Sequence, residues 1–151
     1  MNSENAPFFV DNEVITLTKN GIWIADGHEI THEPTRKLFA RSLVREPDGY
    51  TLKIGRETKK INVEDTAYFV VRVNGESGQG YQVLLNDESE ELLKPETLKY
   101  KPGRLTCLIK KGAEEAKFLH APYFDLLKEL KEDSKQYFLV IQGQSYALSQ
   151  K

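Results

Sequence analysis

Turn dipeptides at short intervals divide the start of this chain into short extended segments, and this feature constrains the fold most. Asn20-Gly21 and Asp26-Gly27 flank residues 22–25, and their glycines supply the positive φ that a tight hairpin turn requires. Upstream, residues 13–19 alternate between apolar and polar side chains as a half-buried strand does. The chain is therefore predicted to open as a meander of short antiparallel strands.

Two later segments have the period of an amphipathic helix instead. The first runs from Pro34 to about Val44, and the second covers residues 121–132, where apolar positions follow the i, i+3, i+4, i+7 rule. Residues 86–103 are charged and irregular, which favours a loop. Further strands are predicted at residues 50–54, 59–63, 67–73, 81–85, 104–110, 137–142 and 144–149. This mixture predicts an α+β fold of mostly antiparallel strands with two helices.

Composition limits the classes of protein and partner. The chain has 151 residues, 39% of them hydrophobic, which suits one domain or two small subdomains with a folded core. A formal charge of −2 gives no general attraction to nucleic acid or to acidic membranes. No signal-like or membrane-length apolar segment is present, and the one cysteine, Cys107, lies in an apolar stretch that favours a buried thiol. We expect a cytoplasmic protein without a cofactor.

The string His28-Glu29-Ile30-Thr31-His32 spells a zinc-protease signature, which requires both histidines on one helix turn. The turn at Asp26-Gly27 before it and Pro34 after it predict a strand followed by the entry to a helix. In an extended chain the two histidines are about 13 Å apart, too far to share a metal ion. The remaining histidine, His120, is not at the spacing of a third ligand. We therefore interpret the string as a coincidence and expect no metal site and no catalytic residue.

The same region carries a dense pattern of aromatic, glycine, apolar and charged residues. Its members are Trp23, Gly27, Ile30, Leu38-Phe39-Ala40, Leu43, Arg45, Asp48-Gly49-Tyr50, Leu52, Glu57, Ile61 and Val63-Glu64-Asp65. This pattern resembles the bacterial family of unknown function DUF1285. The resemblance implies a pleckstrin-homology-like barrel with a small α+β N-terminal part and no established activity. Its implied division is an N-terminal arm at residues 1–12, an α+β subdomain at 13–75 and the C-terminal part of the barrel at 76–151.

The chain departs from the family pattern at several positions. The family usually has Thr-Pro, Lys, Pro and Arg where this chain has Ile54-Gly55, Thr58, Ala67 and His32. If these positions line a pocket, the chemistry of that pocket differs here.

The two halves of the chain share an order of elements, with strands, a proline-initiated helix and further strands in each. Their residues do not align as a repeat.

The first functional hypothesis is a non-catalytic module that binds a small molecule or peptide. Its candidate ligand-binding residues are Arg45, Glu57, Glu64 and Asp65, which lie between predicted strands. Arg45 could hold a carboxylate or phosphate by two parallel hydrogen bonds, and the acidic residues could accept from amines or hydroxyls. The structural alternative is an ion pair of Arg45 with Glu64 or Asp65 that fixes a turn.

Two other hypotheses stay open at this point. One is a hydrolase that uses His28, His32 or the Glu57 and Asp65 carboxylates as acid and base. The other is an assembly protein, a homodimer that buries an aromatic surface at Trp23, Tyr50 and Tyr68, with ordinary core packing as the alternative. We expect neither nucleic acid nor a membrane as a partner.

Overall fold

The structure is a computed structural model that describes residues 8–134 and 136–148. The chain divides into two compact units, Met1–Ala67 and Tyr68–Lys151. The division expected from the sequence was at residue 75, whereas here it falls at the start of the long strand β7, Tyr68–Glu76.

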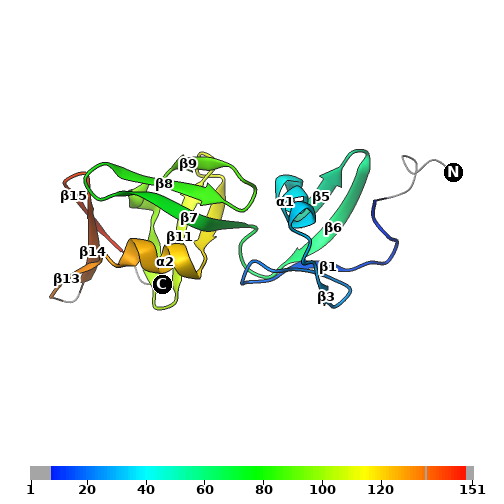
Figure 1. Cartoon of the computed structure of the whole chain (residues 1–151), viewed down its shortest axis with the longest axis horizontal. Helices are drawn as coiled ribbons and strands as arrows, with labels where there is room; N and C mark the ends of the chain where they lie inside the picture. The colour runs from blue at the N-terminus through cyan, green and yellow to red at the C-terminus, as the bar shows by residue number, and fades with distance from the viewer. Residues whose placement is uncertain (1–7, 135, 149–151) are drawn as a thin grey trace. The chain divides into compact units, whose positions relative to one another are not determined.

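The first unit is a six-stranded sheet with one helix (Figure 1). Its strand order is β3-β2-β1-β6-β5-β4, in which β1 and β6 are parallel and all other neighbours are antiparallel. The core includes Phe39, whose ring centroid lies 5.3 Å from that of Trp23 in an edge-to-face contact. The elements are β1 (Ile15–Leu17), β2 (Trp23–Ala25), β3 (His28–Glu29), α1 (Glu33–Arg41), β4 (Leu43–Glu46), β5 (Gly49–Ile54) and β6 (Glu57–Val63).

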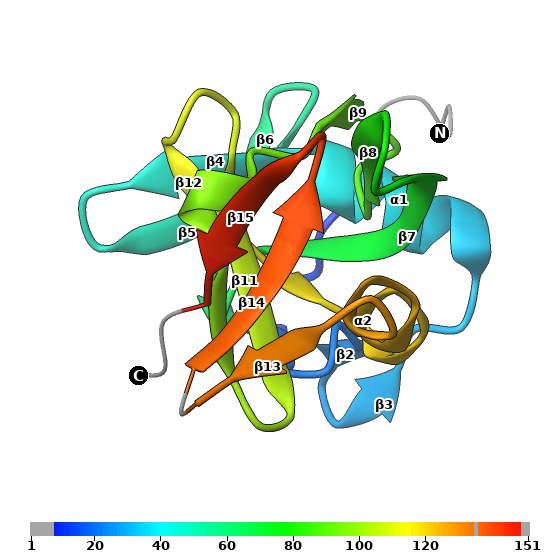
Figure 2. The same ribbon diagram turned by 90° about the vertical axis from the view of Figure 1, so that its left-hand side faces the viewer.

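The second unit contains a six-stranded sheet, a helix and a separate three-stranded sheet (Figure 2). The larger sheet has the order β10-β11-β12-β7-β8-β9, with β12 and β7 parallel, and the smaller one has the order β13-β14-β15. The helix α2 packs against β7. Beside β7, the elements are β8 (Gly80–Leu85), β9 (Glu90–Leu92), the 3₁₀-helix η2 (Pro95–Thr97), β10 (Lys99–Lys101), β11 (Arg104–Ile109), β12 (Glu114–Phe118), α2 (His120–Leu127), β13 (Lys131–Asp133), β14 (Gln136–Ile141) and β15 (Gln144–Ala147).

The two six-stranded sheets have the same topology. In each, three strands form a meander, the next three form a second meander, and the last strand pairs in parallel with the first. A helix follows the third strand in both, namely α1 in the first unit and the short η2 in the second. The structure thus repeats a strand order, and the element that corresponds to α1 is η2 and not the predicted second helix.

The α+β class with mostly antiparallel strands and two α-helices is confirmed. In the strand order of each six-stranded sheet, the two edge strands do not pair with each other, so neither sheet closes into a barrel. The pleckstrin-homology-like barrel therefore stays a prediction. Within the described residues, neither helix has the length and apolar character needed to cross a membrane.

Several predicted boundaries were wrong because strand pairing replaces helix or loop. The first helix ends at Arg41, and the next residues pair with β5 as β4. The second ends at Leu127, and Lys131–Asp133 pairs with β14. The expected loop at 86–103 contains β9, η2 and β10. The end of the predicted last strand, residue 149, lies outside the described residues.

Candidate functional site

The predicted ligand-binding residues are placed on different parts of the first unit. Arg45 lies on β4, with its guanidinium carbon 5.3 Å from the centroid of the Tyr50 ring. Glu57 begins β6, whereas Glu64 and Asp65 follow its last residue. A strand of seven residues is about 20 Å long, so the two ends of β6 do not share a pocket. The structure does not bring the four residues together as one site, and the Glu57 and Asp65 carboxylates do not converge as an acid–base pair.

Glu57 binds the described start of the N-terminal arm, at Phe8 and Phe9. Its carboxylate accepts the backbone N–H groups of Phe8 and Phe9 at 2.6 and 3.0 Å. These bonds, that from Phe9 first, hold the pKa of Glu57 below its usual value because they stabilise the charged form. The rings of Phe8 and Phe9 lie 6.1 and 6.3 Å from that of Phe39. The described part of the arm is thus anchored by a carboxylate and by aromatic contacts.

Glu64 also accepts a backbone hydrogen bond. Its carboxylate oxygen lies 2.9 Å from the backbone nitrogen of Lys19, in the turn between β1 and β2. This contact joins the end of β6 to a neighbouring turn, as a structural polar residue does.

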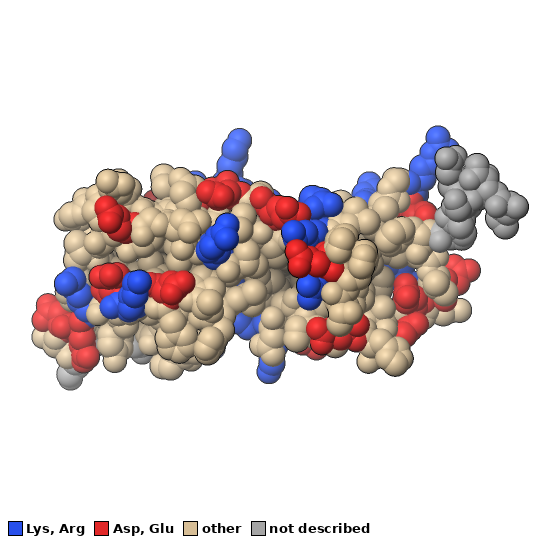
Figure 3. Space-filling view, viewed as in Figure 1, with Lys and Arg blue, Asp and Glu red and all other residues tan. Residues whose placement is uncertain are grey.

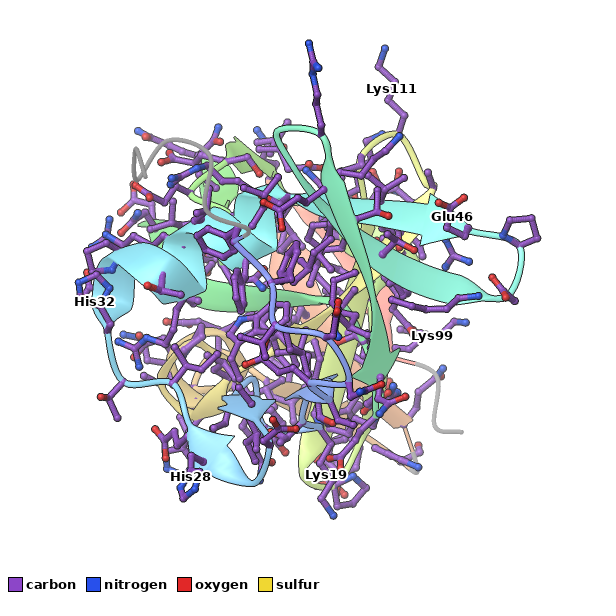
Figure 4. All side chains as sticks on the ribbon, turned by 90° about the vertical axis from the view of Figure 1, so that its right-hand side faces the viewer. Lys19, His28, His32, Glu46, Lys99 and Lys111 are labelled. Carbon is purple, nitrogen blue, oxygen red and sulfur yellow. The ribbon has the colours of Figure 1, made fainter. Side chains whose placement is uncertain are left out.

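As predicted, the segment that contains His28 and His32 is not a helix. His28 is exposed on β3, and His32 precedes α1 with an extended backbone, φ −71° and ψ 110°. The Nδ1 atom of His32 lies 2.7 Å from the hydroxyl oxygen of Thr35 in the first helix turn. Figure 4 shows the two histidines at separate places on the surface of this unit, both pointing outward. Across the described residues, no three His, Cys, Asp or Glu side chains are grouped so that they could hold a metal ion.

The aromatic residues suggested as an assembly surface are largely internal. Trp23 is 3% and Tyr68 is 7% exposed, and Tyr50 is half-buried beneath Arg45. The structure therefore shows ordinary core packing for Trp23 and Tyr68, which was the alternative to an assembly surface.

A cavity of about 320 Å³ lies in the second unit between the β7–β8 hairpin and the C-terminal end of α2. We call it the Tyr81 cavity. Charged residues from both elements line it: Glu76 from the hairpin, and Asp125, Lys128 and Glu129 from the end of the helix. Figure 3 shows acidic and basic side chains close together on the face of this unit that carries α2.

The hairpin positions Tyr81 through a close approach of two backbones. On β8 the buried residues alternate as Tyr81, Val83 and Leu85, so the tyrosine shares their buried face. Its partner on β7 is Gly75, which has a φ of +126°. A Cβ atom at Gly75 would lie 2.2 Å from the carbonyl oxygen of Gly80. Only glycine therefore allows this pairing, and the residue opposite the Tyr81 ring carries no side chain.

The helix contributes carboxylates four residues apart. Asp125 lies in the last turn of α2, and Glu129 follows the helix, where its N–H bonds to the carbonyl of Leu126 at 3.3 Å. Residues at this spacing project from one side of a helix. The helix dipole also places partial negative charge at the C-terminal end of a helix, so this end of α2 adds to the negative potential at the cavity.

Only 7% of Tyr81 is exposed, and its exposed surface includes the hydroxyl oxygen, which makes no hydrogen bond within the described part of the chain. Burial raises the pKa of Tyr81 above its usual value, and the carboxylates of Glu129 and Glu76 raise it further. Both carboxylates line the cavity with Tyr81 and are close enough to repel a phenolate. Within residues 8–134 and 136–148, Glu76, Asp125 and Glu129 make no ion pair. The cavity thus combines an accessible phenolic hydroxyl with carboxylates that make no ion pair in the described residues.

A second cavity of about 280 Å³ adjoins the first and shares Glu129 as a wall. It is lined by Ser77 and Gly78 of the β7–β8 loop and by Val140 and Gly143 of the β14–β15 hairpin. We call it the Val140 cavity. Two hydrogen bonds join its walls, from the N–H of Gln142 to the carbonyl of Ser77 at 2.6 Å and from its side-chain amide to the carbonyl of Gln79 at 3.2 Å.

Sequence reasoning missed the Tyr81 cavity because its walls are distant in the chain. The glycines at 75, 78 and 80 indicated only a hairpin loop, and Tyr81 indicated only a strand. The available signal was the pair Asp125 and Glu129, which places two carboxylates on one side of the predicted helix.

Known proteins share this fold at low sequence identity. No family model matches the chain, and no curated protein matches it. A DUF1285 family protein from Silicibacter pomeroyi DSS-3 is similar over 89% of this chain and 79% of its own, with 17% identity and a TM-score of 0.68. A second, from Shewanella baltica OS155, is similar over 81% of this chain and 96% of its own, with 18% identity and a TM-score of 0.61. The chain therefore has the fold of DUF1285 family proteins, as its sequence pattern predicted.

Proposed function

We propose that this protein is a non-catalytic binding module that holds a small organic cation, an amine, in the Tyr81 cavity. The observation that carries the proposal is Tyr81, a residue only 7% exposed whose hydroxyl is accessible, makes no hydrogen bond within the described residues and lines one cavity with the carboxylates of Glu76 and Glu129. A ligand that enters the cavity can therefore form a hydrogen bond with this hydroxyl. An ammonium group can donate to the phenolic oxygen and to the carboxylates together.

The charge of the cavity supports a cationic ligand. Three carboxylates, of Glu76, Asp125 and Glu129, outnumber the one ammonium group of Lys128. Hydrogen bonds between an ammonium and a carboxylate contribute about 1.5–3 kcal/mol each where solvent is excluded, and less at exposed positions such as these. The C-terminal end of α2 favours positive charge as well.

The size of the cavity supports an organic ligand. A volume of about 320 Å³ is at the lower end of the range for small-molecule sites, about 300–1,000 Å³. Tyr81 and Val73 provide apolar surface beside the charged groups. The proposal includes the cytoplasmic location expected from the sequence, with which a single buried cysteine is compatible.

The test compares three probes that differ only in the charge of the head group, namely butylamine, butanol and butyrate. Isothermal titration calorimetry at low ionic strength should give saturable binding for butylamine alone. Tyr81→Phe removes only the hydroxyl and should weaken butylamine binding about two- to tenfold, and Glu129→Gln should weaken it by a similar factor. Glu96→Gln, an exposed carboxylate on η2 away from the cavity, is the matched control and should bind as the wild type does.

Equal binding of the three probes would contradict the proposal, since charge would then not select the ligand. Wild-type affinity in both Tyr81→Phe and Glu129→Gln would also contradict it, because the amine would then bind elsewhere.

A further inference from the structure

We infer that the amine is elongated, with its cationic head in the Tyr81 cavity and an uncharged tail of several carbon atoms in the Val140 cavity. This inference rests on the proposed function and specifies its ligand. It starts from the wall that the cavities share, the side chain of Glu129. Glu76 lines the first cavity and the next residue, Ser77, lines the second, so the cavities adjoin along the β7–β8 loop as well.

The chemistry of the two cavities differs. In the Tyr81 cavity carboxylates are in excess, whereas in the Val140 cavity Glu129 is balanced by Lys131. The rest of the Val140 cavity is a valine side chain, two glycines and a serine, which carry no charge. A second ammonium group there would face Lys131, while a hydrocarbon chain can pack on Val140 and the glycine backbones. The pair of cavities therefore fits a monoamine with a tail better than a diamine.

The walls of the Val140 cavity are held together before any ligand binds. Gln142 joins the β14–β15 hairpin to the β7–β8 loop by its backbone N–H and by its side-chain amide. A tail that enters this space needs no new ordering of the two loops, so its buried methylene groups add to the affinity.

Gly78 offers a way to close the Val140 cavity alone. A Cβ atom at this position would meet no atom within 4 Å, and its φ lies outside the left-handed region. Gly78→Leu therefore places a side chain in the space beside the loop without backbone strain. Gly78 does not line the Tyr81 cavity, so the site for the cationic head is unchanged.

The experiment measures the affinity of the full chain for n-alkylamines from methylamine to hexylamine by isothermal titration calorimetry. We expect the affinity to rise about two- to fourfold with each methylene group, in proportion to the apolar area that each one buries. Gly78→Leu should flatten this series and leave methylamine binding as in the wild type. Hexylamine should bind more tightly than 1,6-diaminohexane, and hexanol should not bind.

The outcomes separate this inference from the proposed function. If all the amines bind with one affinity, or if Gly78→Leu leaves the increase with chain length intact, the elongated ligand is refuted and the amine site stands. Tighter binding of the diamine than of hexylamine also refutes the uncharged tail. If hexanol binds as hexylamine does, or if no amine binds, the proposed function is refuted together with the inference.

Discussion

Replacement of Gly75 by alanine should destabilise the second unit by about 2–5 kcal/mol. A non-glycine residue at a φ of +126° costs on the order of 1–3 kcal/mol. The added Cβ atom would also lie 2.2 Å from the carbonyl oxygen of Gly80 and 3.0 Å from the Cα atom of Tyr81, so the backbone must move. This movement weakens the end of the β7–β8 ladder, where Gly75 pairs with Tyr81, at about 0.5–1.5 kcal/mol for each hydrogen bond lost.

The matched control is Gly78→Ala in the same loop. Its Cβ atom would meet nothing within 4 Å and its φ is not in the left-handed region, so we expect no loss of stability and a gain of up to about 1 kcal/mol. Urea unfolding followed by circular dichroism gives the free energy of unfolding of each variant. If Gly75→Ala unfolds at the wild-type urea concentration, or if both variants lose the same stability, the close approach at Gly75 does not constrain the hairpin as described.

Four further changes test other parts of the structure. Phe39→Ala should cost about 3–5 kcal/mol in urea unfolding because Phe39 is 4% exposed among aromatic rings, and a loss below about 1 kcal/mol would contradict this packing. Glu57→Gln should expose the N-terminal arm to limited proteolysis. Since the pKa of Glu57 is lowered in the folded protein, the arm contact is present above the usual glutamate pKa and is lost as the pH falls through the lowered value. Equal cleavage of the variant and the wild type at pH 7 would refute the anchor. Burial, and then the nearby Glu91 and Glu115 carboxylates, raise the pKa of Cys107 to about 12. Native protein at pH 8 should therefore react with a thiol reagent far more slowly than unfolded protein. Similar reaction rates of the native and unfolded protein would contradict the burial of this thiol. Glu129→Gln should lower the pKa of Tyr81 in an ultraviolet titration, and an unchanged pKa would mean that the phenol does not face that carboxylate.

Local signals in the sequence predicted the elements that depend on local chemistry. Gly21 and Gly27 have φ of 81° and 83°, as their turn dipeptides required. Pro34 lies in the first turn of α1, where its missing N–H costs nothing. The chain around His28 and His32 is extended because these two signals flank it. Turn and helix-start chemistry is thus enough to exclude the helix that a zinc-protease string requires.

Elements that depend on distant partners could not be predicted in the same way. β12 begins with two glutamates, yet Glu114, Ala116 and Phe118 are buried because the strand lies between β11 and β7. β9 and β10 lie in a charged segment and form only because β8 and β11 offer free edges. Tertiary pairing overrode local propensity in both cases.

The candidate site shows the same limit. The family pattern pointed to Glu57 and Glu64, and the structure gives both carboxylates backbone partners within the first unit. Tyr81 and Glu129 are far apart in the chain and meet only when α2 packs against the β7–β8 hairpin. Residues matched by a family pattern can therefore support a fold, while a cavity with unpaired polar groups lies elsewhere.

The most direct test of the amine site is a nuclear magnetic resonance titration of protein labelled with ¹³C at the tyrosine ζ carbon. Addition of hexylamine should shift the Tyr81 resonance in a saturable manner and lower the pKa of its phenol, because the bound cation offsets the charge of Glu76 and Glu129. Tyr81→Phe identifies the resonance. A Tyr81 signal that does not move at an amine concentration that saturates calorimetric binding would show that the cation does not occupy this cavity.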